Sequence, residues 1–354
     1  MHDRNATNHR TCLAMLALCT ALATSAFAAA PTATASYAVV SRWTLPGTGG
    51  WDCLTADPGR HRLFLSRGDR VEVVDTDSGK LIGTIAGTNG VHAIALAPEL
   101  KLGYTTNGRS NSITVFDYDT LATVREVAVP GANPDLILYE PAGQHLFVFN
   151  GRSRNAVVFD AKTLVVQSTI ALPGKPEFAA DDAHGQLYVN IESEPGRLVR
   201  VNEKTFAVTA DWPLPGCDNP SGLAFDTAHH RLFSSCDNAV LAITDSASGK
   251  AVGRVAIGKG PDGVAFDPAA GLIFVTAGEG HLDIIREETA DRYAAAGSTA
   301  TQAGARTLSY DPGTRRLYTV TANFAPAAAA TAEVPRPRPQ PLPDSFTVLV
   351  LAPH

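Results

Sequence analysis

Seven polar residues that recur along the chain are the strongest candidates for chemistry. Each follows a turn rich in Gly or Pro and precedes a short apolar segment: Asp52, His92, Asp135, Glu177, Ser221, Asp262 and Arg306. Carboxylates that gather in one place repel one another, which raises some of their pKa values unless a cation compensates. We therefore expect a ligand site if the fold brings these residues together. A divalent metal ion is one candidate occupant, since carboxylate and imidazole suit several ions. Its expected ligands are His92, Asp52, Asp135, Glu177 and Asp262.

These residues belong to a repeat of about 40 residues. Segments such as "LTADPGRHRLFLS" and "VAFDPAAGLIFVT" share a marker position that recurs every 40 to 45 residues, at Asp57, Ala97, Glu140, Asp181, Asp226, Asp267 and Asp311. Each copy holds four short apolar segments that are bounded by Gly, Pro, Asp and Asn turns, which is typical of β-strands. Seven such copies predict an all-β fold, a seven-bladed β-propeller with four-stranded blades.

The two ends of the repeat array predict how the ring closes. The last copy has candidate strands at 306–310, 316–321 and 346–352 and lacks a fourth. The segment 37–47, "YAVVSRWTLPG", precedes the first copy and reads as an unattached fourth strand. We therefore expect the N-terminal strand to complete the last blade, in a single propeller domain over residues 29–354.

Strand direction predicts which candidates share a rim of the ring. The marker residues fall in the turn between the first and second strands, where Asp followed by Pro or Gly is turn chemistry. Histidines in those turns are expected to be solvent-exposed turn residues: His61, His145, His184, His229 and His230. The seven candidate residues lie at the opposite end of the first strand, at the mouth of the central channel. A water-filled channel with a polar lining is the alternative interpretation.

The loops between the second and third strands reach the same rim as the seven candidates. "NGRSNS" (107–112) and "NGRSRN" (150–155) are near copies that contribute Asn107, Arg109, Asn150 and Arg152, and His281 belongs to a later loop. Arginine suits an anionic group of a ligand, whereas Asn and Gly alone would make tight turns. The Pro-rich loop 324–345 is expected to be extended and stiff, and it is either a lid over the mouth or a flexible insertion.

A family resemblance follows from these motifs. The chain resembles exported YVTN-type, YncE-like seven-bladed propellers over residues 37–354. The resemblance rests on the "AFDP…LFVT" blade pattern and on loop entries such as "GGWD", "NPSGLAFD" and "GARTLSYDP". A strict Tyr-Val-Thr-Asn run does not occur in the sequence. The resemblance implies a periplasmic or secreted propeller and no settled activity.

The N-terminal 28 residues read as a cleaved signal peptide. An apolar run follows Arg10, and Ala26-Phe27-Ala28 fits a small-residue cleavage pattern. Export would place Cys53, Cys217 and Cys236 in an oxidising compartment. Cys217 and Cys236 should lie on the same rim of one blade, so we expect them to form a disulfide. Cys53 is then a free thiol, for which we expect a buried structural role.

Composition and motifs favour a binding protein over an enzyme. The net charge is -6, which gives no support for binding to nucleic acid or to an anionic membrane. The sequence has no GxSxG elbow, CxxCH haem motif or phosphate-binding loop, so we assign no catalytic residue. We expect a monomer that binds a small molecule, an ion or a protein partner at the channel mouth. The alternative is a metal-dependent hydrolase or lyase that uses the channel-mouth carboxylates.

Overall fold

The computed structural model describes residues 36–327 and 339–354, all within one compact unit of the chain. The described residues form seven four-stranded antiparallel sheets and two short 3₁₀ turns, Pro58–Arg60 and Pro98–Leu100. No helix in this part of the chain is long and apolar enough to cross a membrane. The predicted signal peptide and the middle of the Pro-rich loop lie outside the described residues. The predicted fold class, an all-β seven-bladed propeller, is confirmed.

Each sheet is one blade, and its strands run outward in sequence order except in the last blade, whose outermost strand is the N-terminal β1. The first strands line the centre: β2 (Leu54–Asp57), β6 (Val91–Ala97), β10 (Pro134–Glu140), β14 (Lys175–Asp181), β18 (Pro220–Asp226), β22 (Pro261–Asp267) and β26 (Leu308–Asp311). The second strands are β3 (Arg62–Ser66), β7 (Leu102–Asn107), β11 (His145–Asn150), β15 (Gln186–Glu192), β19 (Arg231–Cys236), β23 (Leu272–Ala277) and β27 (Arg316–Thr321).

The third strands follow, and the fourth strands form the outer edge. The third strands are β4 (Arg70–Asp75), β8 (Ser112–Asp117), β12 (Asn155–Asp160), β16 (Gly196–Asn202), β20 (Val240–Asp245), β24 (His281–Thr289) and β28 (Phe346–Pro353). The fourth strands are β5 (Leu81–Ala86), β9 (Thr123–Ala128), β13 (Val166–Ala171), β17 (Ala207–Leu214), β21 (Ala251–Ala256), β25 (Arg292–Ala300) and, in the last blade, β1 (Tyr37–Leu45).

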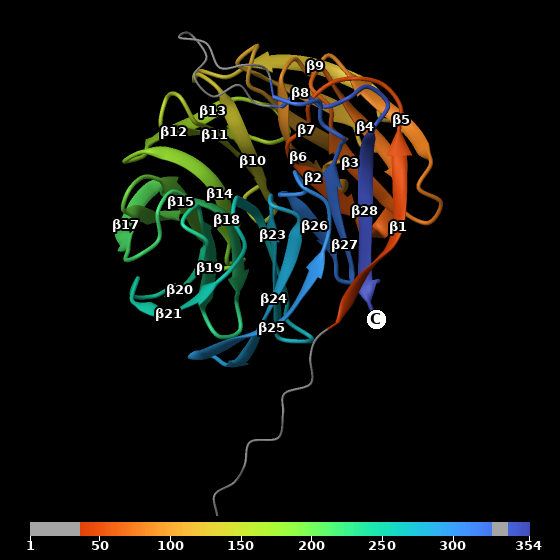
Figure 1. The fold of residues 1–354 in the computed structure, drawn as a ribbon. Helices are drawn as coiled ribbons and strands as arrows, with labels where there is room; N and C mark the ends of the chain where they lie inside the picture. Colours follow the sequence, from red (N-terminus) through yellow and green to blue (C-terminus); the bar gives the residue numbers. More distant parts are fainter. Residues whose placement is uncertain (1–35, 328–338) are drawn as a thin grey trace, which may run out of the picture. The chain divides into compact units, whose positions relative to one another are not determined.

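The blades close into a ring through contacts between their first strands. Each first strand contacts that of the next blade, and β26 of the last blade contacts β2 of the first. Figure 1 shows β1 lying beside β28, so that the first and last strands of the described residues share one blade. The pairing is antiparallel, from Tyr37 opposite Pro353 to Leu45 opposite Phe346. The predicted closure by the N-terminal strand is therefore confirmed.

Burial explains the different composition of inner and outer strands. The second and third strands pack against neighbouring blades on both faces, so they are near-continuous apolar runs. In β11, for example, the successive residues Val148 and Phe149 are fully buried on opposite faces of the sheet. Burying a side chain of this size contributes about 2–3 kcal/mol. The fourth strands face solvent on one side and expose residues such as Val124 and Val166.

The marker turns hold the blades together on the rim away from the candidate residues. Asp267 is buried, accepts a hydrogen bond from the Ala269 N–H (3.0 Å) and pairs with Arg315 of the next blade (3.1 Å). Asp57 is likewise buried, pairs with Arg62 of its own blade and accepts a hydrogen bond from the Tyr118 hydroxyl of the next blade (2.8 Å). The expectation that all the turn histidines are exposed is wrong for His145. Its ring is mostly buried beside Glu140 and packs edge-on against Phe206.

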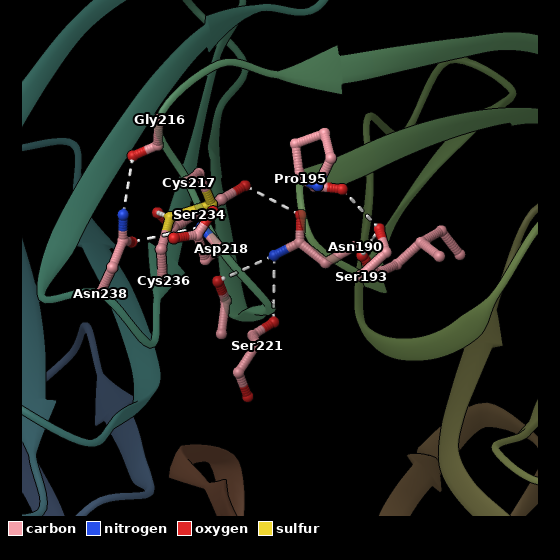
Figure 2. Close-up of a disulfide and its surroundings, with 12 residues drawn as sticks. Asn190, Ser193, Pro195, Gly216, Cys217, Asp218, Ser221, Ser234, Cys236 and Asn238 are labelled. Atoms are coloured by element: carbon pink, nitrogen blue, oxygen red, sulfur yellow. Dashed lines mark hydrogen bonds between the residues drawn. A yellow bond between two sulfur atoms is a disulfide. The ribbon is translucent and has the colours of Figure 1, made fainter.

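The predicted disulfide between Cys217 and Cys236 is confirmed. It joins the loop before β18 to the end of β19 across 19 positions of sequence, and both cysteines are fully buried. Figure 2 shows the bond beside the side chain of Asn238, which donates to the Gly216 carbonyl (3.1 Å). The Asp237 N–H also donates to the Asp218 carbonyl (2.9 Å). The bond therefore fixes two loops of blade 5, the blade of β18–β21, against each other.

We predict that the double substitution Cys217→Ala with Cys236→Ala lowers the free energy of unfolding by about 3 kcal/mol, because the unfolded chain regains the entropy of the open loop. Urea unfolding followed by fluorescence measures this difference. Dithiothreitol should lower the stability of the wild-type protein to that of the variant and leave the variant unchanged. Equal stabilities under non-reducing conditions would contradict the prediction.

Candidate functional site

The structure brings all seven candidate residues to one cavity of about 430 Å³ at the channel mouth. Each residue comes from a different blade, at the end of the first strand that lies opposite the marker turn. The lining includes the seven residues that the repeat predicted: Asp52, His92, Asp135, Glu177, Ser221, Asp262 and Arg306.

Backbone bulges turn these side chains toward the cavity. In five blades the register of the first strand shifts at its entry, for example between Pro134 and Leu136 and between Pro261 and Gly263. The skipped residues are Asp135 and Asp262, which have no partner in the ladder. A bulge re-aims a side chain and leaves its residue outside the ladder. The Pro at the strand start suits a position that donates no ladder hydrogen bond.

Buried polar residues of the second strands fix the backbone of the site residues. Thr106 donates a hydrogen bond to the Asp135 carbonyl of the next blade (2.8 Å). Asn190 donates to the Ser221 carbonyl (3.0 Å), and Thr276 donates to the Arg306 carbonyl. These contacts join neighbouring blades directly behind the cavity, so they hold the bulges in place.

Two cationic side chains each neutralise carboxylate charge in a different part of the cavity. Lys175 pairs with Glu177 and with Glu192. On another side, Arg306 pairs with Asp262 through Nε and Oδ2 (3.1 Å), and Ser221 donates to the other oxygen of Asp262. Six carboxylates line the cavity against these two permanent cations, so the lining carries an excess of negative charge: Asp52, Asp135, Glu177, Glu192, Asp237 and Asp262.

A third part of the cavity has only a histidine as compensation. Nδ1 of His92 lies 2.6 Å from Oδ2 of Asp52 and 3.2 Å from Oδ1 of Asp135. The three side chains come from blades 1, 2 and 3, and all three are partly buried. One carboxylate oxygen from each Asp and one imidazole nitrogen lie within 4.8 Å of one another, a spacing that suits a metal ion.

Burial dominates the protonation of the cavity carboxylates. Burial raises the pKa of Asp262 to about 6, although the Arg306 guanidinium opposes the shift. Burial also raises the pKa of Asp135 and of Glu177, against the opposing charges of His92 and Lys175 respectively. Burial lowers the pKa of His92, but the carboxylates of Asp52 and Asp135 outweigh it and the net shift is upward. The cavity therefore favours protonated acids, or any cation that replaces those protons.

Sequence reasoning did not assign several lining residues to the site. Lys175 begins β14, and Glu192 ends β15. Asn219 directly precedes β18, and Asp237 directly follows β19. Their position at the end of a second strand could have identified Glu192 and Asp237, because second strands end on the rim where the first strands begin. The buried structural role expected for Cys53 is confirmed in part. This free cysteine packs against a buried hydrophobic cluster, but it is only partly buried and also lines the cavity.

The structure does not bring the second-to-third-strand loop candidates to the cavity. Asn107 is fully buried and hydrogen bonded to Thr105, Ser112 and Thr114 of its own blade. Asn150 is also fully buried, and it donates to Asn155 (2.9 Å). Three further candidates are exposed beside their turns and do not line the cavity: Arg109, Arg152 and His281. A ligand contact through any of the five stays a prediction.

The disulfide supports the blade 5 side of the site. Cys217 lies two residues before Asn219, and Cys236 directly precedes Asp237, so the bond fixes both segments that supply these lining residues. Figure 2 shows Ser221 on the same loop, with Asn190 donating to its carbonyl.

Thiolate chemistry is not favoured at Cys53. Burial and the carboxylates of Asp52 and Asp262 raise the pKa of this thiol well above its ordinary value. The nucleophile in cysteine chemistry is the deprotonated thiolate, so the negatively charged cavity favours cation binding over attack by this sulfur.

The cavity carboxylic acids with raised pKa values are suited to accept or donate a proton near neutral pH.

Comparisons with known proteins support the fold. A family model described as "Lactonase, 7-bladed beta-propeller" matches residues 68–168, which is less than a third of the chain. The structure is similar to Kuenenia stuttgartiensis hydrazine synthase with a TM-score of 0.67 and 18% sequence identity, covering 78% of this chain and 92% of that chain. At this identity the likeness concerns the fold alone. A search of curated proteins finds no match to the chain.

We predict that Asp262→Asn changes how stability depends on pH. Because the folded-state pKa of Asp262 is about 6, above its ordinary value of 3.8, the folded protein holds a proton here that the unfolded chain has lost between these values. The stability that this proton contributes is present below about pH 4 and is lost as pH rises through 6. The free energy of unfolding of the wild type, relative to Asp262→Asn, should therefore fall by about 3 kcal/mol over that window.

Urea unfolding at several pH values between 4 and 8 measures this difference. Asp291→Asn is the matched control, because Asp291 is exposed and pairs with Arg231 outside the cavity. Its difference from the wild type should stay flat. A relative stability that rises with pH in the Asp262 comparison would show instead that the ion pair with Arg306 dominates.

Proposed function

We propose that this protein is a binding propeller that holds a small polar ligand carrying positive charge in the channel-mouth cavity. The single observation that carries the proposal is the charge of the lining, in which six carboxylates face only Lys175 and Arg306. A charged group in a cleft of opposite sign gains from the field of the whole lining. Ammonium, guanidinium and metal cations are the chemical classes that this field favours.

The shape and preorganisation of the cavity support a small occupant. A volume of about 430 Å³ falls within the range of small-molecule sites. The bulged first strands and the hydrogen bonds from Thr106 and Asn190 hold the lining before any ligand arrives. Preorganised groups lose little conformational entropy on binding. The site therefore suits direct capture of a solute.

We also infer that the protein is exported and works in the periplasm or outside the cell. Two features support this location. The first is the signal-like sequence of residues 1–28, and the second is the Cys217–Cys236 disulfide, which is stable in an oxidising compartment. A ligand for this cavity would then be an extracellular or periplasmic solute.

Thermal-shift screening tests the binding proposal. The probes are diamines, guanidinium compounds and divalent cations, paired with dicarboxylates of similar size. We expect the cationic probes to raise the melting temperature and the anionic probes to leave it unchanged, because only the former gain from the negative lining. The effect should weaken as pH falls below about 6, where Asp262 becomes protonated and loses its charge.

Variants assign the effect to the cavity. Asp262→Asn and Glu177→Gln should each reduce the stabilisation by the best organic cation, while Asp291→Asn, outside the cavity, should retain it. The proposal fails if no cationic probe stabilises the protein, or if the control variant loses the response to the same degree as the cavity variants.

A metal-dependent hydrolase is the second candidate function. The match of residues 68–168 to a family described as lactonases favours it over other enzyme classes. In this function a cavity carboxylate with a raised pKa, such as Glu177 or Asp262, would act as general base, while a metal ion would polarise the substrate carbonyl.

Proton release from a panel of lactones, recorded at constant pH with and without added divalent cations, tests this second function. Hydrolysis that depends on the cation and is lost in Glu177→Gln or Asp262→Asn would support an enzyme. Rates equal to those of buffer for every lactone would leave binding as the function of the site.

A further inference from the structure

We infer that Asp52, His92 and Asp135 form a site for one divalent transition-metal ion, such as Zn²⁺ or Mn²⁺, at one side of the cavity. This inference deepens the proposed function and rests on it, because it names the ion and its ligands within the same negatively charged cavity. The proposed ligand atoms are an oxygen of each carboxylate and Nδ1 of the imidazole.

Two of the three separations between the ligand atoms lie close to those around a bound ion. Two ligands at a right angle, each about 2.1 Å from a metal ion, lie roughly 3 Å apart. Nδ1 of His92 lies 2.6 Å from the Asp52 oxygen and 3.2 Å from the Asp135 oxygen. The atoms that would meet the ion therefore already face one another before it binds.

The distribution of cations in the cavity singles out this group. Glu177 and Glu192 share Lys175, and Asp262 pairs with Arg306, so those carboxylates already have permanent partners. Asp52 and Asp135 form their close ion pairs with an imidazole, whose charge depends on one proton, and Lys175 and Arg306 act on them only from farther away. A divalent ion would replace that proton and compensate both carboxylates at once.

We propose a smaller set of metal ligands than the sequence suggested. Glu177 and Asp262 were expected to share the ion with the other three, but their cation partners already engage them. Three ligands remain, from three neighbouring blades, and the cavity beside them leaves room for water or a ligand group on the ion. Open positions of this kind distinguish catalytic and ligand-binding metal sites from closed structural ones.

The ligand types indicate the class of ion. Calcium and magnesium are bound almost entirely by oxygen, whereas an imidazole nitrogen with carboxylate oxygens suits zinc, manganese and their neighbours. We therefore expect Zn²⁺ or Mn²⁺ to bind more tightly than Ca²⁺ at the same concentration.

The chain offers an internal comparison for this inference. Asp226, His229 and Glu287 also lie within 4.8 Å of one another, but they belong to the marker-turn rim and do not line the cavity. In that group, His229 is about half exposed and lies against two buried carboxylates from adjacent blades. Variants of this second group separate a cavity site from binding by any acidic cluster with a histidine.

Calorimetric titration of the chelator-treated full-length protein with Zn²⁺, Mn²⁺ or Ca²⁺ alone, at pH 7.5, tests the inference. We expect one equivalent of Zn²⁺ or Mn²⁺ to bind, and His92→Ala and Asp135→Asn to weaken this binding by more than about tenfold, since even outer-shell changes cost about 10–100-fold. His229→Ala should bind like the wild type. Titration with Co²⁺, read as visible absorption, reports the coordination directly.

Several outcomes would overturn the inference. These are binding of no ion tighter than Ca²⁺, loss of binding in His229→Ala but not in His92→Ala, and no change in Co²⁺ absorption on removal of the imidazole. Thermal melts of each variant in the absence of metal separate misfolding from lost coordination. If Asp135→Asn does not fold, Asp52→Asn replaces it.

Failure of this inference is distinguishable from failure of the proposed function. If an organic cation stabilises the protein and no metal binds, the cavity is a binding site and His92 serves as an imidazolium between two carboxylates. If the metal binds and no organic cation does, the inference holds and the occupant of the cavity is the ion itself. If neither binds, both proposals fail.

Discussion

The antiparallel pairing of β1 with β28 is the interaction on which the rest of the structure depends. A blade can bury its two faces only between neighbours, so an open array of seven blades would leave two apolar faces in water. The register from Tyr37 to Leu45 completes the last blade. The buried cluster that joins blades 7 and 1 includes Leu45, Leu54 and Phe346. Closure therefore converts a linear repeat into a ring.

The candidate site is a consequence of this closure. Asp52 and Arg306 lie about 250 residues apart in sequence, yet both line one cavity because the first and last blades are neighbours. Thr307 donates to the Asp52 carbonyl across that junction (2.9 Å). No single loop forms the site. Each blade contributes one or a few polar groups at the entry of its first strand or the end of its second strand.

Charge compensation gives the cavity its chemical character. Lys175 pairs with Glu177, and Arg306 pairs with Asp262. Asp52 instead pairs with His92, whose positive charge depends on a titratable proton. Breaking a buried ion pair leaves an uncompensated charge, which is costly. Excess carboxylates in the cavity therefore destabilise the folded protein, and binding of a cation would reduce this destabilisation.

The sequence by itself determined the number of blades, the strand closing the ring, the disulfide and the seven positions at the channel mouth. These follow from local patterns, because a repeat of about 40 residues with one polar residue at or just before the entry of the first strand places that residue on the same rim in every blade. The alternation of turn residues predicted the strand ends to within a few residues, as for 37–47 against Tyr37–Leu45.

Only the tertiary structure decided which polar groups meet. Asn107 and Arg109 looked like site residues because their loops reach the correct rim, but the former is buried within its blade and the latter points elsewhere. Lys175 and Cys53 entered the cavity unpredicted, and the pairing of Lys175 with two glutamates left His92 with two aspartates. Pairings of this kind depend on side-chain directions and distances between blades, and the sequence pattern specifies neither.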